Sequence, residues 1–511
     1  MELLAIEIFI SIAFLGSFSI FLYLYKIIVW KPRVLRAQLE KQGIRGPKPC
    51  FLYGNIKQMK KIQSMVFNDP SQHMSHDYYA KIFAYFHQWK NEYGPVYTYS
   101  TGTIQNIYVT DPVMVKEFSL NTSLDLGKPT YLQKERGPLF GLGLLTSNGA
   151  LWLHQRKVIA PQFYMDKVKG MVNLMVDSTM SLVNSWESRI ESGGQVVDIE
   201  VVEDLRNFSA DIISKACFGS SYSKGKDIFE KLRGLQKVMS KQGLLLGVPF
   251  VSYLPTKNNR QLWKLEKEVG SLILKIVNER KEAKSENDLL QMILEGANNE
   301  EVKIASNDSF IVDNCKNIYF AGHETTATSA SWILILLAKH PEWQSCVRDE
   351  VLEICKGSSP DVDMLRKMKQ LTMVIHEALR LYPPAPFVTR EVFRSTKFGD
   401  IDVPKGVNLW LPLITLHQDP EFWGSDAHEF NPDRFSQGIA KACKIPQVYM
   451  PFGSGPRICA GQNFAMIELK ILISLILSTF TFTLSPTYRH SPGFNLVIEP
   501  KHGVHLLIKK L

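Results

Sequence analysis

The pattern of apolar and polar positions predicts a helix-rich domain behind an apolar N-terminal segment. Residues 3–25 are apolar or small apart from Glu7, and about 20 such residues cross a bilayer as a helix. Basic residues follow this segment and acidic residues lie at its start, which places the C-terminal bulk on the cytosolic side. We therefore expect residues 1–30 to form a membrane anchor; a buried core helix is the alternative.

The next segment, residues 31–50, is basic and contains several prolines. Its stretch R-G-P-K-P, residues 45–49, predicts a stiff extended tether, because proline fixes φ and disfavours helix at the residue before it. No internal repeat or long low-complexity stretch divides the remainder of the chain. We therefore treat residues 51–511 as one domain.

Apolar residues at helical spacing dominate this domain from about residue 70 to residue 390. The polar stretch 284–308 predicts a connection, although it contains one short apolar patch, L-L-Q-M-I-L. Strands are favoured only at residues 390–413 and 504–508. The predicted fold class is mainly α with a minor β portion. Helices are predicted at residues 168–186, 228–242 and 261–283. A further, long helix is predicted to begin at a cap formed by Asp308 or Ser309 and to end at His340-Pro341.

Composition narrows the function classes without naming one. The 511-residue chain is 45% hydrophobic and carries a formal net charge of +9, which favours acidic partners or an anionic membrane surface. It contains no dense run of Lys and Arg with interleaved aromatic residues, so we do not expect it to bind nucleic acid. Its seven cysteines are scattered and form no C-x-x-C pair, which argues against a zinc site and a disulfide scaffold.

The stretch A-G-H-E-T-T, residues 321–326, places a carboxylate and two hydroxyls inside the long apolar helix. Desolvating such groups without partners is costly. The pattern begins like the H-E-x-x-H of zinc proteases, but Ala327 stands where the second histidine should be. Helix curvature, with threonine hydroxyls bonded back to main-chain carbonyls, is a simpler explanation.

A second unusual stretch is F-G-S-G-P-R-I-C-A-G, residues 452–461. Its glycines and proline predict a tight turn that presents Cys459 just before an apolar, helical segment. A helix N-terminus favours the thiolate form of a cysteine. An inert buried thiol is the usual fate of a lone cysteine, but it needs no glycine-rich turn. A thiolate here could act as a nucleophile or as a metal ligand.

These residues resemble the haem-binding loop of the cytochrome P-450 monooxygenases, F-x-x-G-x-R-x-C-x-G. Four further stretches match motifs of that family in the same order along the chain: W-L-H-Q-R, A-G-H-E-T-T, E-A-L-R and F-N-P-D-R-F. The loop motif is matched at Phe452, Gly455, Arg457, Cys459 and Gly461, and the other motifs at Trp152 with Arg156, Ala321 to Thr326, Glu377 with Arg380, and Arg434.

The resemblance implies a role for each matched residue. Cys459 would be the axial ligand of the iron of haem b. Glu377, Arg380 and Arg434 would form a buried ion-pair network. The haem propionates would be held by Trp152, Arg156, Arg457 and Arg390, the last on its spacing after E-A-L-R alone.

The A-G-H-E-T-T stretch also acquires a function from the resemblance. Ala321 and Gly322 would let a flat macrocycle or dioxygen approach the helix closely. Thr325 would hold dioxygen and water by hydrogen bonds, and Glu324 would relay protons. These two residues are the candidate catalytic pair.

The resemblance implies a single-pass protein of the endoplasmic reticulum membrane with a cytosolic catalytic domain. It would insert one oxygen atom from O2 into an apolar small molecule. No flavin or nicotinamide domain is apparent in the sequence, so electrons would come from NADPH through a separate cytochrome reductase. The loop at residues 243–255 is apolar, and we expect it to dip into the membrane beside a substrate entrance; a buried core strand is the alternative.

The stretch G-I-R-G-P-K-P-C-F-L-Y-G, from residue 43, looks most like a plant subgroup that oxidises gibberellins and other terpenoid acids. We therefore expect a plant terpenoid or terpenoid acid, a gibberellin-like diterpenoid or a triterpenoid, as the substrate. A cytokinin or other hormone hydroxylase is the alternative within the family. A haem-thiolate isomerase or dehydratase, or a non-catalytic haem-binding membrane protein, would belong to a different class, and Thr325 argues against both.

Overall fold

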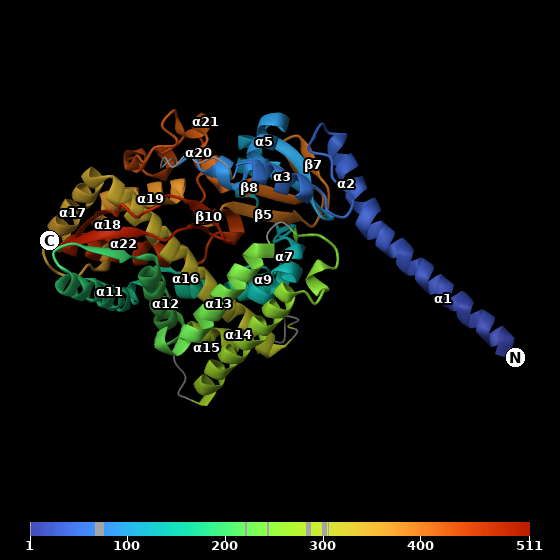
Figure 1. The fold of residues 1–511 in the computed structure, drawn as a ribbon, viewed down its shortest axis with the longest axis horizontal. Helices are drawn as coiled ribbons and strands as arrows, with labels where there is room; N and C mark the ends of the chain where they lie inside the picture. Colours follow the sequence, from blue (N-terminus) through green and yellow to red (C-terminus); the bar gives the residue numbers. More distant parts are fainter. Residues whose placement is uncertain are drawn as a thin grey trace.

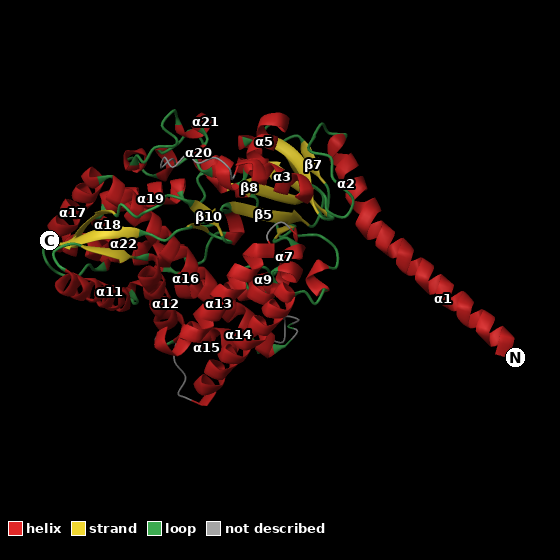
Figure 2. Cartoon of the chain, in the orientation of Figure 1, coloured by secondary structure: helices red, strands yellow, loops and turns green. Residues whose placement is uncertain are grey.

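The computed structural model describes residues 2–66, 76–219, 222–242, 245–282, 288–298, 304 and 306–511. Helices make up most of it, and the strands form small separate sheets, one near α3 (Ile56–Val66) and α5 (Ala84–Tyr93) and another near the C-terminus beside α18 (Val362–Lys367) and α22 (Gln462–Thr479) (Figures 1 and 2). The predicted class, mainly α with a minor β portion, is confirmed.

The helices are α1 (Glu2–Tyr25), α2 (Lys31–Glu40), α3 (Ile56–Val66), α4 (Tyr79–Ile82), α5 (Ala84–Tyr93), α6 (Pro112–Leu120), α7 (Thr130–Glu135), α8 (Gly137–Phe140), α9 (Gly149–Ile159), α10 (Met165–Lys169), α11 (Val172–Gly193), α12 (Val202–Phe218), α13 (Tyr222–Gln242), α14 (Lys257–Glu282), α15 (Leu289–Gly296), α16 (Asn307–Lys339), α17 (Pro341–Cys355), α18 (Val362–Lys367), α19 (Lys369–Leu381), α20 (Leu413–Gln418), α21 (Pro420–Trp423) and α22 (Gln462–Thr479). The strands are β1 (Val96–Thr101), β2 (Ile104–Val109), β3 (Leu126–Gly127), β4 (Val197–Glu200), β5 (Phe387–Val392), β6 (Thr396–Phe398), β7 (Ile401–Val403), β8 (Asn408–Pro412), β9 (Phe480–Leu484), β10 (Pro492–Phe494), β11 (Ile498–Pro500) and β12 (His505–Lys510).

The N-terminal helix projects from the body as a rod (Figure 1). The continuous helical stretch Ala5–Glu40 is long and apolar enough to cross a membrane, and its most apolar part is not buried in the protein. Helix continues through a π-helical turn into α2, so the first half of the segment 31–50 is helical. Pro32 lies in the first turn of α2, directly after the π-helical turn.

Residues 44–49 have no regular secondary structure, but they are not a free linker. The N–H of Thr98 in β1 donates to the carbonyl of Arg45 over 2.9 Å. The guanidinium of Arg36 donates to the carbonyls of Gly46 and Pro47. The proline-rich segment therefore lies along the edge of the sheet.

The largest sheet has the strand order β1-β2-β8-β5-β3, and only the β2–β8 pair is parallel. The strands predicted in residues 390–413 and at the C-terminus are confirmed as β5 to β8 and β12. The hairpin of β1 and β2 was not predicted. Nearly all its residues are buried on both faces, so the alternation that marks a half-buried strand is absent.

Helix α16 runs through the body and packs along α12 and α22. Its N-cap is Ser306, whose hydroxyl accepts the N–H of Ser309, so the prediction of Asp308 or Ser309 as the cap is wrong. His340 ends it as predicted. The predicted helix 168–186 is two helices that break at Gly170, and the predicted connection 284–308 contains α15. The predicted helix 228–242 lies within α13, and the predicted helix 261–283 lies within α14 except for residue 283, which is outside the described residues.

Candidate active site

The cysteine loop leads directly into α22. Gly453 and Gly455 have φ of 73° and 67°, a left-handed conformation that favours glycine. The N–H of Cys459 donates to the carbonyl of Phe452 over 2.8 Å and closes the loop. Gly461 occupies the N-cap of α22. The sequence thus folds locally to hold one thiol just before a helix N-terminus.

The thiol of Cys459 has solvent-accessible surface, yet protein atoms surround it closely. Burial raises its pKa, while the N–H of Gly461 and the charge of Arg156 act to lower it. Burial outweighs these two effects, so the neutral thiol is favoured in the absence of a metal. A bound metal removes the proton from a thiol ligand.

Guanidinium groups converge beside this loop. The Arg457 guanidinium lies 4.3 Å from the centre of the Trp152 ring. Its Nη2 donates to the side-chain oxygen of Asn148 over 2.7 Å, whereas its Nη1 is buried and lacks a partner among the described residues. Arg390 lines the same small cavity as Arg457 and Trp152 and does not point to solvent. Arg156, one turn after Trp152 on α9, donates to the carbonyl of Ile458.

These cations are poorly compensated. Within the described part of the chain, no carboxylate lies within ion-pair distance of Arg156, Arg390 or Arg457. Burial lowers the pKa of Arg390 to about 10 and that of Arg457 to about 9, the latter with the help of Arg390 and Arg156. An anion would relieve this repulsion. A thiol flanked by guanidinium groups fits a haem, which offers an iron and two carboxylates.

The E-A-L-R helix, α19, carries a fully buried ion pair. Arg380 Nε and Nη2 each donate to a Glu377 carboxylate oxygen over 2.7 Å, and neither side chain is exposed. Arg434 Nε lies 3.4 Å from Glu377, so the structure brings all three predicted members together. The remaining donors of Arg380 bond to the carbonyls of His417, Ala427 and Glu429.

On α16, the hydroxyl of Thr325 donates to the carbonyl of Ala321 over 2.7 Å, as the curvature explanation predicts. Gly322 faces the neighbouring helix: an added Cβ would lie 2.5 Å from the Ile213 side chain on α12. Its carbonyl also accepts the hydroxyl of Ser209 from α12. The small size of Gly322 therefore serves close helix packing, which corrects the proposal that it makes room for a macrocycle.

Glu324 lies against α12 as well. Its carboxylate is 2% exposed and 3.7 Å from Arg206 Nε, and both its oxygens lack hydrogen-bond partners among the residues that the structure describes. Arg206 uses its Nη2 to bind Glu499 over 2.7 Å. The structure thus groups Ala321 with Thr325, and it groups Glu324 with Arg206.

A cavity of about 770 Å³ reaches α16 at Phe320, the residue before Ala321. The ring of Phe320 meets that of Phe140 edge-on, with centroids 5.3 Å apart. Most of the lining is apolar or aromatic, and ligand pockets of this volume hold drug-sized molecules. The aromatic lining residues are Tyr78, Phe83, Tyr85, Phe86, Tyr99, Tyr131, Phe140, Phe320, Phe387, Trp410 and Phe494.

Comparison with known proteins decides what this arrangement is. The family model "Cytochrome P450" matches residues 45–507. The chain belongs to the cytochrome P450 family. It is 54% identical to cytochrome P450 714C2 of Oryza sativa subsp. japonica, with 96% of each chain covered. It is 48% identical to cytochrome P450 714A2 of Arabidopsis thaliana over 96% of each chain, and 47% identical to cytochrome P450 714B3 of Zea mays over 99% and 97%.

Membership of the cytochrome P450 family makes the protein a monooxygenase, and therefore an oxidoreductase. The family also implies a haem-iron cofactor, an apolar substrate, dioxygen and a redox partner that supplies electrons. The donor set around Cys459 is chemically suited to that cofactor.

Two further residues of the cytochrome P450 site were missed in the sequence. Asn148 occupies the N-cap of α9 but makes no capping bond there. Its amide instead accepts the N–H of Lys128 and donates to the Lys128 carbonyl, while also binding Arg457. Burial and the charges of Arg390 and Arg457 hold the pKa of Lys128 well below its usual value. The sequence S-N-G before α9 is typical of an ordinary helix cap. It therefore does not indicate that Asn148 bonds to Lys128 and Arg457.

Proposed function

We propose that this cytochrome P450 inserts one oxygen atom into a plant terpenoid acid of the gibberellin type. The observation that supports this most is the aromatic cavity of about 770 Å³ that reaches α16. Its size and apolar lining suit a rigid polycyclic hydrocarbon skeleton. The likeness of the segment from residue 43 to the gibberellin-oxidising subgroup points the same way.

Within that function, Cys459 would ligate the iron, and Arg156, Arg390 and Arg457 would hold the propionates beside Trp152. Once bound, the haem iron supplies the oxygen chemistry, and a thiolate ligand favours O–O cleavage. The protein's own groups must then deliver protons. Thr325 would position dioxygen and water. For this, its hydroxyl must give up its hydrogen bond to the Ala321 carbonyl and bond to these ligands instead. Glu324 provides an exchangeable proton one residue before Thr325.

Two other functions compete with this one. A cytokinin hydroxylase would also use an apolar cavity, but its substrate is flatter and smaller than the space available. A haem-thiolate isomerase or dehydratase would need Cys459 without a proton-delivering alcohol, and Thr325 favours a monooxygenase.

We also propose the location and the electron donor. Residues 1–30 would anchor the protein in the endoplasmic reticulum membrane, residues 31–50 would link the anchor to the body, and residues 51–511 would form the cytosolic domain. NADPH would supply electrons through a separate cytochrome reductase, whose acidic surface would suit the basic chain.

The loop at residues 243–255 supports this membrane orientation from residue 245 onward, since residues 243 and 244 lie outside the described part. Its side chains Phe250, Tyr253 and Leu254 are 57%, 71% and 51% exposed. The loop contains turns and a short 3-10 helix, so the alternative of a buried core strand is wrong. In Figure 1 it lies on the side of the body from which α1 projects. We propose that this apolar tip contacts the same membrane.

The direct test is turnover in microsomes that contain the full chain and a plant reductase. The panel would comprise a gibberellin-type diterpenoid acid, a triterpenoid acid and a cytokinin. We expect NADPH-dependent product from the diterpenoid acid, heavier by one oxygen atom. Product from the cytokinin alone would replace the proposed substrate class with its alternative.

A further inference from the structure

The large cavity is apolar, but its charges have one sign. Among the described residues that line it, Lys81, Arg136 and Lys501 are cationic, and none is Asp or Glu. Lys81 and Lys501 are exposed residues, whereas Arg136 is 7% exposed. A cation on the wall of an apolar cavity is costly to desolvate unless an anion compensates it. Arg136 therefore needs an explanation.

The contacts of Arg136 leave part of its guanidinium free. It lies between α7 and α8, and its Nη1 donates to the carbonyl of Met239 on α13 over 2.9 Å. Its Nε and Nη2 make no hydrogen bond within the described part of the chain. They are also not among the polar atoms that are fully buried without a hydrogen-bond partner. They therefore keep accessible surface, and an oxygen ligand can reach them.

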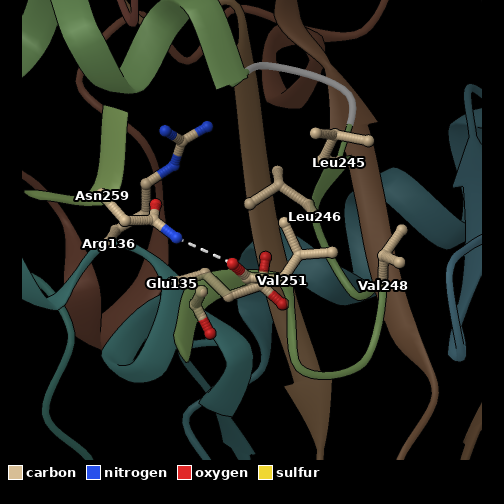
Figure 3. Close-up of a pocket in the computed structure, with 8 residues that line it drawn as sticks. Glu135, Arg136, Leu245, Leu246, Val248, Val251 and Asn259 are labelled. Carbon is tan, nitrogen blue, oxygen red and sulfur yellow. Dashed lines mark hydrogen bonds between the residues drawn. The ribbon is translucent and has the colours of Figure 1, made fainter. Parts of the chain in front are cut away.

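The adjacent acid, Glu135, attracts this cation and lines a smaller pocket with it, but the two side chains form no ion pair in the described part of the chain. Figure 3 shows the Arg136 guanidinium pointing away from the Glu135 carboxylate, which lies by the loop that holds Val248 and Val251. That carboxylate accepts the N–H of Gly247 over 2.7 Å. Burial raises the pKa of Glu135 to about 7, so it carries only part of a charge near neutrality. Glu135 also lies outside the wall of the large cavity.

A structural role is the alternative. Arg136 binds a carbonyl in the last turn of α13, where a cation interacts favourably with the helix dipole. That contact uses only one nitrogen of the guanidinium. It does not explain why the other two nitrogens keep accessible surface without an ion pair in the described part of the chain.

We propose that Arg136 is an anion-binding site that holds the carboxylate of the substrate. The inference rests on the proposed function and deepens it, because it specifies an acid. Phe140, one turn further along α8, touches Phe320 on α16. A carboxylate at Arg136 thus leaves the hydrocarbon skeleton between these rings and the aromatic wall, close to Ala321.

The test is substrate-induced spectral titration of the full-length holoenzyme in membranes. The probes are kaurenoic acid, a diterpenoid, and lauric acid, a linear chain, each with its neutral methyl ester. The variants are Arg136→Gln, Arg136→Lys and the control Lys501→Gln, which removes an exposed cation of the same cavity. The carbon monoxide spectrum of each variant shows whether the haem site is intact.

We expect wild type to bind at least one acid more tightly than its ester. Arg136→Gln should weaken that acid about 10- to 100-fold and leave the ester unchanged, because a hydrogen bond to a charged group contributes about 1.5–3 kcal/mol. Arg136→Lys should restore part of the preference, and should fold if the glutamine variant does not. Lys501→Gln should change little.

Two outcomes would overturn the site: no acid preference in wild type, or equal loss of acid and ester in Arg136→Gln with an intact haem spectrum. Neither outcome would contradict the proposed function, because oxidation of the terpenoid skeleton could continue without an anion site. Conversely, an Arg136-dependent preference for lauric acid, with no diterpenoid oxidised, would support the site and contradict the proposed substrate.

Discussion

The cysteine side of the site and the α16 side differ in which of their polar groups are bonded within the protein. The loop of Cys459 closes on its own backbone and the Glu377–Arg380 pair is bonded at both ends, whereas Arg457 Nη1 lacks a partner among the described residues. Along α16, Glu324 is buried without a hydrogen bond among the described residues. Arg136, which lines the large aromatic cavity that reaches α16, also keeps two nitrogens accessible to a ligand.

The cysteine side therefore forms a fixed binding site for a cofactor, whereas polar groups on the α16 side change hydrogen-bond partners when a ligand arrives. The backbone of the Cys459 loop and the Glu377–Arg380 pair are bonded before a cofactor is present, and such networks rigidify a core; the guanidinium groups beside the loop keep bonding capacity for an anion. Groups that meet dioxygen, water or substrate must keep bonding capacity until the ligand arrives. Substitutions on the cysteine side should therefore abolish the haem site, whereas those on the α16 side should alter turnover while the haem stays bound.

The largest effect should come from Cys459→His. It removes the thiolate ligand, so the thiolate-type carbon monoxide spectrum should be lost completely. Cys443→Ala is the matched control, since this half-buried cysteine bonds to the carbonyl of Ile445. A retained thiolate-type spectrum in Cys459→His would end the assignment of the iron ligand.

Breaking the ion pair should come next. Glu377→Gln leaves Arg380 charged in a fully buried site, which costs about 3–5 kcal/mol. The yield of folded holoenzyme and the midpoint of its thermal unfolding should both fall. Arg366→Gln, which breaks an exposed pair with Asp363, should cost about 0–1 kcal/mol. Similar losses in the two variants would mean that the buried network is not structural.

On the α16 side, Thr325→Ala should bind haem and substrate normally but release reduced oxygen without product. Glu324→Gln should slow the whole cycle, because the exchangeable proton is lost while size is kept. Each loss should be about 10²–10⁴-fold in coupled turnover, measured as product and peroxide per NADPH consumed. Ser331→Ala removes the same kind of bond, to the Ala327 carbonyl, and should stay coupled. Wild-type coupling in both α16 variants would contradict a catalytic role for the stretch.

Asn148→Ala tests whether the guanidinium groups beside Cys459 depend on the hydrogen bonds of Asn148. The variant frees Arg457 and the Lys128 backbone at once, so haem should dissociate about 10- to 100-fold faster. Transfer of haem to excess apomyoglobin measures that rate. Asn91→Ala, on an exposed face of α5, should leave it unchanged. An unchanged rate in Asn148→Ala would mean that the guanidinium groups are held without these hydrogen bonds.

The smallest effect concerns pH. The folded-state pKa of Glu135 is raised to about 7, so the folded protein takes up this proton at higher pH than the unfolded chain. The stability it contributes is present at low pH and is lost as pH rises through about 7. Glu135→Gln should remove about 1 kcal/mol of that pH dependence, since partial exposure screens the group. Thermal midpoints at about pH 5 and pH 8 would measure it, with the exposed Glu353→Gln as control.

The sequence predicts the cysteine side better than the α16 side for a physical reason. The motifs around Cys459 and Glu377 are short, and their residues act within one loop or one helical turn. Helix periodicity likewise marks α13, α14 and α16, whereas the doubly buried β1–β2 hairpin has no alternation to find. The contacts of Gly322 with Ile213 and of Glu324 with Arg206 join distant segments, so no local pattern encodes them.

The central claim is that the α16 side guides oxygen from O2 into a terpenoid acid, and isotope labelling tests it most directly. The full chain, with reductase and NADPH, would be supplied with heavy-isotope dioxygen and a gibberellin-type diterpenoid acid. We expect a product that carries one heavy oxygen atom and does not form without NADPH. A rearranged or dehydrated product without the isotope would contradict it.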